Sequence, residues 1–317
     1  PMSDAPVITD GAFDSQNLAF WDAEHKTYRA YWRYFTKNDG QRSIRAIRTA
    51  TSDDFLHWKD QADLSYVDSP PEELYTNQIK PYARAPHLLI GFPTRYVERG
   101  WNPSMKALPE REHREMRSSA SPRYGMAITE ALLMASRDGN RFTRWGEAFL
   151  RPEIERPGSW NYGQQYLAWQ LVETASSFEG APPELSLYAT ESYWTGNSSA
   201  LRRYTLRPDG FVSIHGTLGG GEMVTKPLIF DGGTQLRLNV STSAAGSVRV
   251  ELQDSTGKPL PGYTRADCDD VFGDSLDRPV TWKGQADLGG LACKPIKLGF
   301  ALQDADLYAF RFARDDQ

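Results

Sequence analysis

The sequence predicts an all-β fold, and three features of the 317-residue chain support that prediction. Helical periodicity is scarce, while short alternating or aromatic runs recur between Gly, Pro, Asn and Asp. Aromatic residues make up 12% of the chain, with 9 Trp and 15 Tyr, and such residues favour strands. The chain is also longer than the size at which one hydrophobic core stops growing, so we expect two domains.

Charge and composition narrow the class of partner. The formal net charge is -5, and no basic patch or tail dominates, so we expect neither a nucleic acid nor a membrane surface as partner. No apolar run approaches the roughly 20 residues that span a bilayer. Flat indole and phenol faces complement the C–H faces of sugar rings. The composition therefore favours an oligosaccharide or polysaccharide.

The first strands begin at a polar cluster. Asp14, Gln16 and Asn17 lead into an apolar strand over 18–21, and its antiparallel partner follows over 28–35. Asp14 thus lies at the mouth of an inward strand. There it either caps a turn with its side-chain oxygen or serves as a functional carboxylate.

An internal repeat extends this pattern. Two segments, 52–58 and 136–145, contain Ser-x-Asp followed by Trp. The Ser and Asp side chains can bond the backbone of a tight turn while the Trp fills the space between neighbouring sheets, as in propeller blades. We predict three blades, over about 10–62, 70–152 and 157–216.

The second and third predicted blades open on polar clusters as well. Their amide and phenol groups can bond sugar hydroxyls but exchange no protons usefully near neutral pH. The candidate substrate-binding residues are Gln16, Asn17, Tyr75, Asn77, Gln78, Tyr162, Gln164 and Gln165. Two arginines join this set, Arg33 after Asp14 and Arg95 among aromatic residues. Each either holds an acidic group of a sugar or packs on an aromatic ring.

A charged insertion interrupts the second blade. Residues 98–124 are rich in Arg, Glu and Pro and are predicted to form a surface loop, with a short helix over 110–117. The mixed charge is typical of a solvated face, a lid over the site or a contact with a partner subunit.

The C-terminal part has a different character. Closely spaced strands with one wet face predict a β-sandwich over 217–317, after a propeller portion over 1–216. Strict alternation would send Tyr308, Phe310 and Phe312 to one buried face and Leu307 to the other.

Cysteine and histidine give little sign of metal binding. Cys268 and Cys293 are the two cysteines, which excludes a thiolate cluster and leaves one disulfide or two free thiols. The five histidines have no ligand-like spacing. We expect no cofactor and no transition metal, while a structural calcium ion is neither predicted nor excluded.

The blade-closing and C-terminal motifs resemble a known group. The motifs at 52–58, 136–139, 246–252, 280–284 and 306–310 are similar to those of five-bladed β-propeller glycoside hydrolases of families 32, 43 and 68. The chain looks most like family 32-type proteins with an attached C-terminal β-sandwich. That resemblance implies a glycosidase acting on a glycan in a propeller funnel, in a secreted or periplasmic protein.

This sequence departs from those families in two ways. Their Trp-Met-Asn-Asp-Pro-like opening and their Arg-Asp-Pro and Glu-Cys motifs are absent as such, so no catalytic role transfers by motif. Three blades also leave a propeller open. We therefore expect further blades from a segment before residue 1 or from another chain, as in a homo-oligomer.

Glycoside hydrolysis needs two carboxyl groups, about 5 to 5.5 Å apart for retention and about 6.5 to 9.5 Å apart for inversion. Asp14 is the best placed acid, and Glu130 and Glu191 are the candidates for the second, with Glu173 behind them. Each of the three glutamates is otherwise a blade-edge or surface residue. The alternative function is a non-catalytic glycan-binding propeller, because amides stand where blades two and three would present acids.

Overall fold

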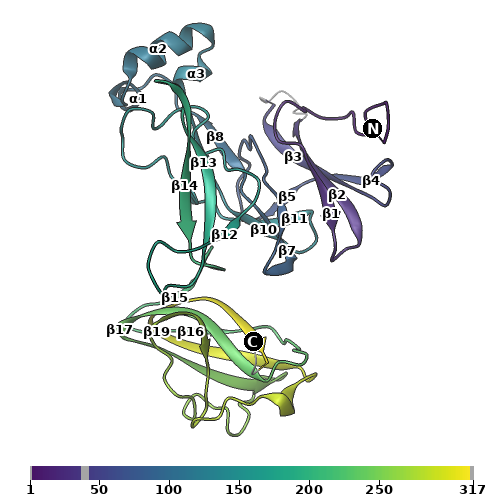
Figure 1. Ribbon diagram of the computed structural model, residues 1–317, viewed down its shortest axis with the longest axis vertical. Coiled ribbons are helices and arrows are strands. Elements are labelled where there is room, and N and C mark those ends of the chain that lie inside the picture. The colour runs from purple at the N-terminus through teal and green to yellow at the C-terminus, as the bar shows by residue number, and fades with distance from the viewer. Residues whose placement is uncertain (1, 37–42, 315–317) are drawn as a thin grey trace. The chain divides into compact units, whose positions relative to one another are not determined.

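The fold is all-β, as the sequence predicts (Figure 1). A computed structural model describes residues 2–36 and 43–314. The chain separates into two compact units. The N-terminal unit runs to Val172 and includes Ser186–Tyr204, and the C-terminal unit comprises Glu173–Leu185 and the chain from Thr205 onward. No helix in the described ranges is long and apolar enough to cross a membrane.

The first sheet of the N-terminal unit has the strand order of a propeller blade. Its four antiparallel strands are neighbours in sequence order, which is the meander that each blade repeats. They are β1 (Leu18–Asp22), β2 (Thr27–Phe35), β3 (Arg45–Ser52) and β4 (Trp58–Asp63).

The second sheet follows the same plan with one addition. Its order is β5-β11-β10-β7-β6, and β5 joins the edge of the antiparallel set by pairing parallel with β11. The strands are β5 (Ser65–Val67), β6 (Lys80–Tyr82), β7 (Ala85–Gly91), β10 (Met134–Ser136) and β11 (Arg141–Arg144). A separate antiparallel pair, β8 (Thr94–Glu98) and β9 (Ala127–Ala131), lies between β7 and β10 in sequence.

Both Ser-x-Asp motifs form the tight turns that the sequence predicts. The serine Oγ accepts the backbone amide three residues later, at 2.9 Å from Phe55 N in the first turn and at 2.9 Å from Gly139 N in the second. Asp54 Oδ1 and Asp138 Oδ1 each accept two further backbone amides. Each turn thereby satisfies its own backbone donors.

The second of these turns packs against the first sheet. The Tyr31 hydroxyl on β2 donates to the Gly139 carbonyl at 2.8 Å. Gly139 has a φ of +78°, and a Cβ there would lie 2.5 Å from the Arg29 guanidinium carbon. Glycine is required here because a side chain would be strained and would collide.

The insertion of the second blade is folded and packed. It forms α1 (Pro103–Ala107), α2 (Arg111–Ala120) and α3 (Arg123–Met126), so the predicted helix is confirmed. Arg114 on α2 is 1% exposed and donates to three backbone carbonyls at 2.7 to 2.9 Å. Met105 and Leu108 are buried against Ile128. The prediction of a solvated surface loop is therefore wrong for these residues.

The third sheet has the order β12-β13-β14, with β12 (Val172–Thr174), β13 (Glu184–Thr195) and β14 (Ser198–Leu206). A turn follows this sheet, in which Gly210 N donates to Arg207 O at 3.0 Å. The strand that follows, β15 (Ile214–Gly216), pairs with β19 (Ile296–Ala313) and so belongs to the C-terminal sheet. The predicted third blade, over about 157–216, therefore extends too far along the chain.

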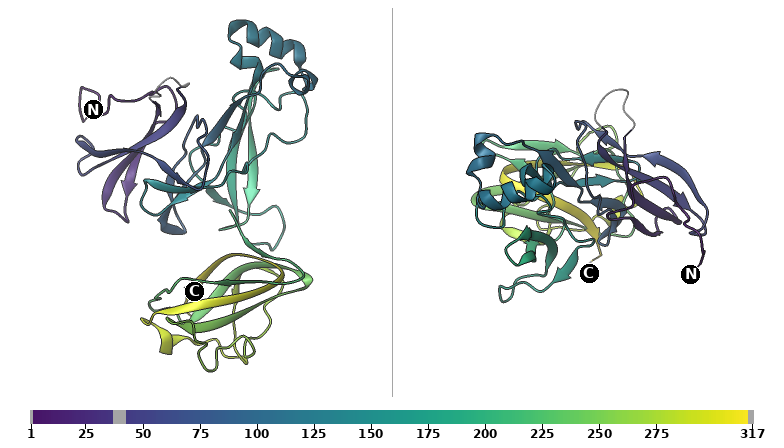
Figure 2. Two further views of the ribbon diagram at one scale, coloured as in Figure 1. Left: turned by 180° about the vertical axis from the view of Figure 1, so that it is seen from behind. Right: turned by 90° about the horizontal axis from the view of Figure 1, so that it is seen from above.

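The C-terminal unit is one hydrogen-bonded sheet built on two long strands, β17 (Gln235–Asp254) and β19 (Figures 1 and 2). These strands pair antiparallel along most of their length, with register shifts near Asn239 and after Thr242. The edge strands are β15, β16 (Gly221–Val224) and β18 (Asp274–Pro279), and η1 (Gly289–Leu291) is a short 3-10 helix. Apolar side chains of β17 and β19 form a single buried core with Trp282.

A β-bulge corrects the predicted alternation in β19. Asn239 faces Ala309 and the next residue of β17 faces Leu307, so Tyr308 has no partner across the ladder. Leu307 is therefore in the core, and Phe310 packs against the same core. Tyr308 instead lies under the Arg207 guanidinium, whose carbon is 4.2 Å from the ring centre.

The two cysteines are free. Cys293 is exposed, whereas Cys268 is buried and accepts a hydrogen bond from Val250 N at 3.2 Å. Burial raises the pKa of the Cys268 thiol.

Candidate functional site

The structure brings the three polar openings of the N-terminal unit together. Asn77 Nδ2 donates to the Gln16 carbonyl at 3.0 Å, which joins the second opening to the first. Gln78 Nε2 donates to the Leu167 carbonyl, which joins the second opening to the third. The three segments that share this sequence pattern are therefore in contact in the structure.

Most of the predicted sugar-binding side chains are buried there. Asn77, Gln78 and Tyr162 are 2 to 4% exposed, and Gln164 and Gln165 are fully buried. Their amides bond backbone carbonyls of neighbouring loops, as a buried amide must to avoid a desolvation cost. These residues hold the loops in place, whereas Gln16, Asn17 and Tyr75 keep some exposure.

An aromatic cluster lies beside the openings. Tyr75 and Tyr166 stack with ring centres 5.4 Å apart, and the hydroxyls of Tyr75 and Tyr162 are 2.8 Å apart. Burial raises the pKa of Tyr162, so its hydroxyl stays protonated near neutral pH. We call this set the tyrosine cluster; its members are Tyr75, Tyr96, Tyr124, Tyr162, Tyr166, Tyr193 and Trp194.

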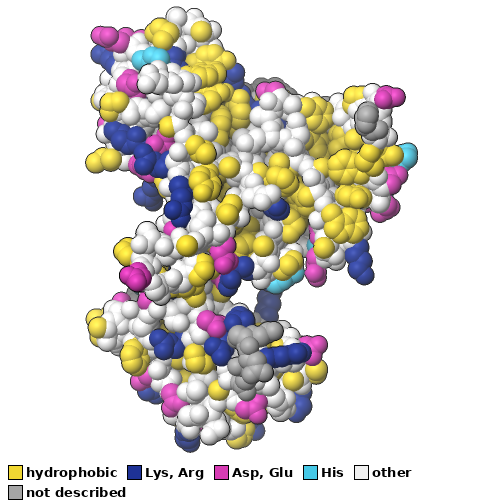
Figure 3. Space-filling view, viewed as in Figure 1, with side chains coloured by type: hydrophobic (Ala, Val, Ile, Leu, Met, Phe, Trp, Pro, Cys, Tyr) yellow, Lys and Arg dark blue, Asp and Glu magenta, His cyan; other side chains and the backbone are white. Residues whose placement is uncertain are grey.

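Sequence reasoning found only Tyr75 and Tyr162 of this cluster. The other members come from separate segments, among them β8, α3 and β13. The available signal was the high aromatic content, which does not say which rings meet. Other aromatic residues of this unit are exposed. Phe13 precedes β1, Trp21 lies on β1 and Phe35 on β2, and their side chains are 40 to 49% exposed. Figure 3 shows hydrophobic side chains gathered over this unit.

Buried arginines flank the tyrosine cluster. The guanidinium carbons of Arg33 and Arg45 lie 5.1 and 4.8 Å from the centre of the Tyr75 ring. Arg45 Nη1 also donates to Glu73 Oε2 at 2.5 Å. Burial lowers the pKa of Arg33, and Tyr75 partly offsets that effect. Both guanidiniums thus lie on one phenol ring, and each is also paired with a carboxylate, Arg33 with Asp14 and Arg45 with Glu73.

The insertion adds two more arginines. Arg123 lies with its guanidinium carbon 5.0 Å from the Tyr124 ring centre, and that of Arg117 is 5.4 Å from the Trp194 ring. Arg117 is 6% exposed and donates to the Tyr193 carbonyl at 3.3 Å. The insertion therefore contributes directly to the tyrosine cluster.

Asp14 stands at the edge of this arrangement. Its carboxylate forms an ion pair with Arg33, while 67% of its side chain is exposed. The same guanidinium donates to Ser15 Oγ at 2.9 Å. Asp14 is thus an accessible carboxylate that is fixed to a buried arginine, which in turn contacts the tyrosine cluster.

Arg95 and Glu130 pair with each other, away from the tyrosine cluster. Arg95 Nε donates to Glu130 Oε1 at 2.8 Å, and Arg95 Nη1 donates to Glu72 Oε1 at 2.8 Å. In the β8–β9 ladder Arg95 lies opposite Glu130, and Tyr96 is the next residue of β8. Because side chains alternate along a strand, the Arg95 and Glu130 side chains face away from Tyr96.

Glu191 is also held by arginines. It is 3% exposed, and its Oε1 accepts from Arg156 at 2.8 Å and from Arg202 at 2.5 Å. Burial alone would raise the pKa of Glu191, but the two arginines lower it below its usual value. Glu173, on β12, is exposed. Glu130 and Glu191 are thus held by arginines, and neither makes a direct contact with Asp14.

Within the described ranges, no group of three or more His, Cys, Asp or Glu side chains has an arrangement that would hold a metal ion.

Comparison with known proteins gives only distant likenesses. No family model matches the chain, and no curated protein matches it. An N-acetylgalactosamine deacetylase from F. plautii matches with 10% identity and a TM-score of 0.35, over 92% of this chain and 51% of that one. A family 43 arabinoxylan arabinofuranohydrolase from Bacillus subtilis matches with 11% identity and a TM-score of 0.27, over 98% and 55%. The chain thus spans about half the length of these two proteins.

A family 32 β-fructofuranosidase from Bombyx mori matches with 8% identity and a TM-score of 0.28, over 91% of this chain and 89% of that one. The matched structures therefore include members of two of the glycoside hydrolase families that the sequence motifs resemble.

Proposed function

We propose that this chain belongs to a carbohydrate-active enzyme of the glycosidase type, with Asp14 as an essential carboxylate. The observation that supports the proposal is the position of Asp14. It is the only acidic side chain within the three polar openings, it is 67% exposed, and Arg33 connects it to the tyrosine cluster. Partly exposed tyrosine rings offer flat faces for the C–H groups of a sugar.

The ion pair with Arg33 suits a carboxylate that must stay ionised. An ionised Asp14 would act as the nucleophile, as the base that activates water, or as the stabiliser of an oxocarbenium-like transition state. Arg33 would at the same time fix the orientation of the carboxylate.

The proposed reaction also needs a second carboxyl group, for which three glutamates are candidates. Glu130 and Glu191 remain candidates from the sequence, although arginines occupy both in this structure. Glu98 is a further candidate, because it is exposed and accepts the Tyr96 hydroxyl at 2.8 Å at the border of the tyrosine cluster. A protonated glutamate there would serve as the general acid.

The test is hydrolysis of a panel of plant and algal oligosaccharides by the full chain and by Asp14→Asn. We expect the substitution to abolish turnover while the protein stays folded. Asp10→Asn is the matched control, since Asp10 is also an exposed aspartate, 74% accessible, and is paired with an arginine, Arg48, at 2.8 Å. Turnover in Asp14→Asn equal to that of Asp10→Asn would refute the role of Asp14.

A non-catalytic glycan-binding protein is the second candidate function. The observation in its favour is that arginines engage Glu130 and Glu191 and that the amides of the openings are buried. This function predicts saccharide binding in calorimetry with no product after long incubation. Any specific bond cleavage that is lost in Asp14→Asn would eliminate it.

A further inference from the structure

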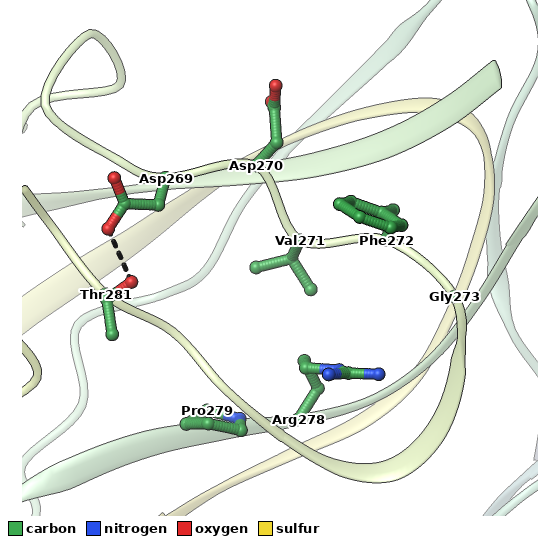
Figure 4. A pocket seen from close by; sticks show the side chains of 8 residues that line it. All are labelled: Asp269, Asp270, Val271, Phe272, Gly273, Arg278, Pro279 and Thr281. Atoms are coloured by element: carbon green, nitrogen blue, oxygen red, sulfur yellow. Dashed lines mark hydrogen bonds between the residues drawn. The ribbon is translucent and has the colours of Figure 1, made fainter. Parts of the chain in front are cut away.

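A small hollow opens in the C-terminal unit beside β18 (Figure 4). Residues 269–273 form one wall, and Arg278, Pro279 and Thr281 form the other. The hollow holds about 180 Å³. Pockets for drug-sized ligands usually hold about 300 to 1,000 Å³, so this one has room for a single small ring.

An exposed aromatic ring stands at this hollow on a rigid backbone. Phe272 is 62% exposed. The residue before it, Val271, exchanges two backbone hydrogen bonds with Val248, at 2.8 and 3.0 Å. The residue after it, Gly273, is bonded in both directions to Thr242, at 3.0 Å each. The backbone on either side of the ring is therefore already ordered before a ligand binds.

Two polar groups with unused bonding capacity border the same hollow. The Arg278 guanidinium has no hydrogen bond or ion pair with any described residue, and Figure 4 shows it across the hollow from the Phe272 ring. Asp269 Oδ2 accepts from the Thr281 hydroxyl at 2.5 Å and from Gly284 N at 2.8 Å. Its Oδ1 has no partner among the described side chains and backbone groups.

The neighbouring acid does not neutralise Arg278. Asp270 Oδ1 and Oδ2 accept from Arg249 at 2.6 and 3.2 Å, and Figure 4 shows the Asp270 side chain pointing away from Arg278. The hollow thus combines an aromatic face, a donor-only guanidinium and an acceptor-only carboxylate oxygen.

We propose that this hollow binds one ring of a neutral saccharide. A sugar hydroxyl can accept a hydrogen bond from the Arg278 guanidinium while the C–H face of the same ring covers Phe272. Asp270 is paired with Arg249, and the charges of Asp269 and Arg278 offset each other, so the hollow has no net charge that favours a uronate over a neutral ring. The site is separate from the residues of the proposed function and does not depend on catalysis there.

Fluorine NMR on the full chain tests the proposal. 4-Fluorophenylalanine at position 272 is titrated with cellotetraose, xylotetraose, arabinotetraose and nystose, each up to about 20 mM, which reaches affinities in the millimolar range. We expect a saturable shift of the signal with at least one of them. The control label is at position 178, because Phe178 is 77% exposed in the same unit and should not respond.

Affinity measurements on variants complete the test. We expect Phe272→Ala and Arg278→Gln each to weaken binding about tenfold, which corresponds to about 1.4 kcal/mol. Phe178→Ala and Arg265→Gln should bind like the parent protein, since Arg265 is a half-buried arginine that is paired with Glu222. No shift at position 272 with any of the four saccharides would overturn the proposal. Equal loss in the control variants, or tighter binding of tetragalacturonate, would overturn it too.

Discussion

The two units differ in how many polar side chains they bury. In the C-terminal unit, Asn239 is the one polar residue that is buried among the described residues, and the core is a single apolar cluster. In the N-terminal unit, buried arginines, amides and hydroxyls separate several smaller apolar clusters. Arg33, Arg114 and Gln165 are typical of this second kind of interior.

The difference corresponds to two ways in which burial stabilises a folded unit. An apolar core gains free energy from area that is removed from water and needs no partner at a fixed angle. A buried guanidinium or amide contributes only while its acceptors stay in place, and it is costly when one of them is lost. The N-terminal unit therefore fixes the positions of its loops tightly, and those loops form the candidate site.

The largest effect that we expect is from Phe300→Ala in the C-terminal unit. Phe300 is fully buried in the single core, and truncation of such a ring typically costs about 3 to 5 kcal/mol of unfolding free energy. Urea unfolding with hydrogen exchange at peptide resolution would assign the loss to this unit. Phe272→Ala, at an exposed ring of the same unit, should cost little; a similar loss in both would contradict the distinction.

Arg114→Met should have the next largest effect. It leaves three backbone carbonyls without their buried donor, which we expect to cost about 2 to 4 kcal/mol in the N-terminal unit. Arg111→Met on the same helix is the control. Arg111 is 57% exposed and pairs with Glu115, so its loss should cost less than about 0.5 kcal/mol. If both variants unfold at the parent's urea midpoint, the insertion is not packed as described.

Glu191→Gln should change how stability depends on pH. The folded-state pKa of Glu191 is lowered, so its contribution is complete above the unfolded pKa of about 4.3 and is lost as the pH falls through the lower folded value. The glutamine variant should be less stable than the parent at pH 7, by about 1 to 3 kcal/mol. The gap should shrink below about pH 4. A gap that stays constant between pH 7 and 3 would show that the charge of Glu191 is not involved.

The smallest effect concerns the hydroxyl contact in the tyrosine cluster. Tyr75→Phe removes the 2.8 Å contact with Tyr162 and keeps the ring, so we expect a loss of about 0.5 to 1.5 kcal/mol in thermal unfolding. Tyr28→Phe is the control, because the Tyr28 hydroxyl has no partner among the described residues. A loss in the control as large as that in Tyr75→Phe would contradict a contribution from the contact between the Tyr75 and Tyr162 hydroxyls.

The sequence predicted the features that depend on local chemistry. The Ser-x-Asp turns at Ser52 and Ser136 satisfy neighbouring amides, so a short motif determines them. The first two strands follow from alternation and aromatic content in the same way. The three polar openings were also recognised, because they repeat.

Features that depend on distant partners were not predictable. The ion pair of Asp14 with Arg33 and the burial of Gln165 arise only when separate strands meet. The assignment of Tyr308 failed because a bulge opposite Asn239 changes which residues face the core, and no residue type marks that bulge. The pairing of Arg95 with Glu130 likewise follows from the register of two strands that are far apart in sequence.

The pairing of β15 with β19 has a mechanical consequence. Ile214, the first residue of β15, pairs with Leu307 of β19, the last strand of the unit, which continues to Ala313. Because the two strands are antiparallel, tension applied through both ends opens their hydrogen bonds one after another, like a zipper, and not all at once in shear. β15 spans only Ile214–Gly216, so a weak pull should peel it away while β17 and β19 remain paired.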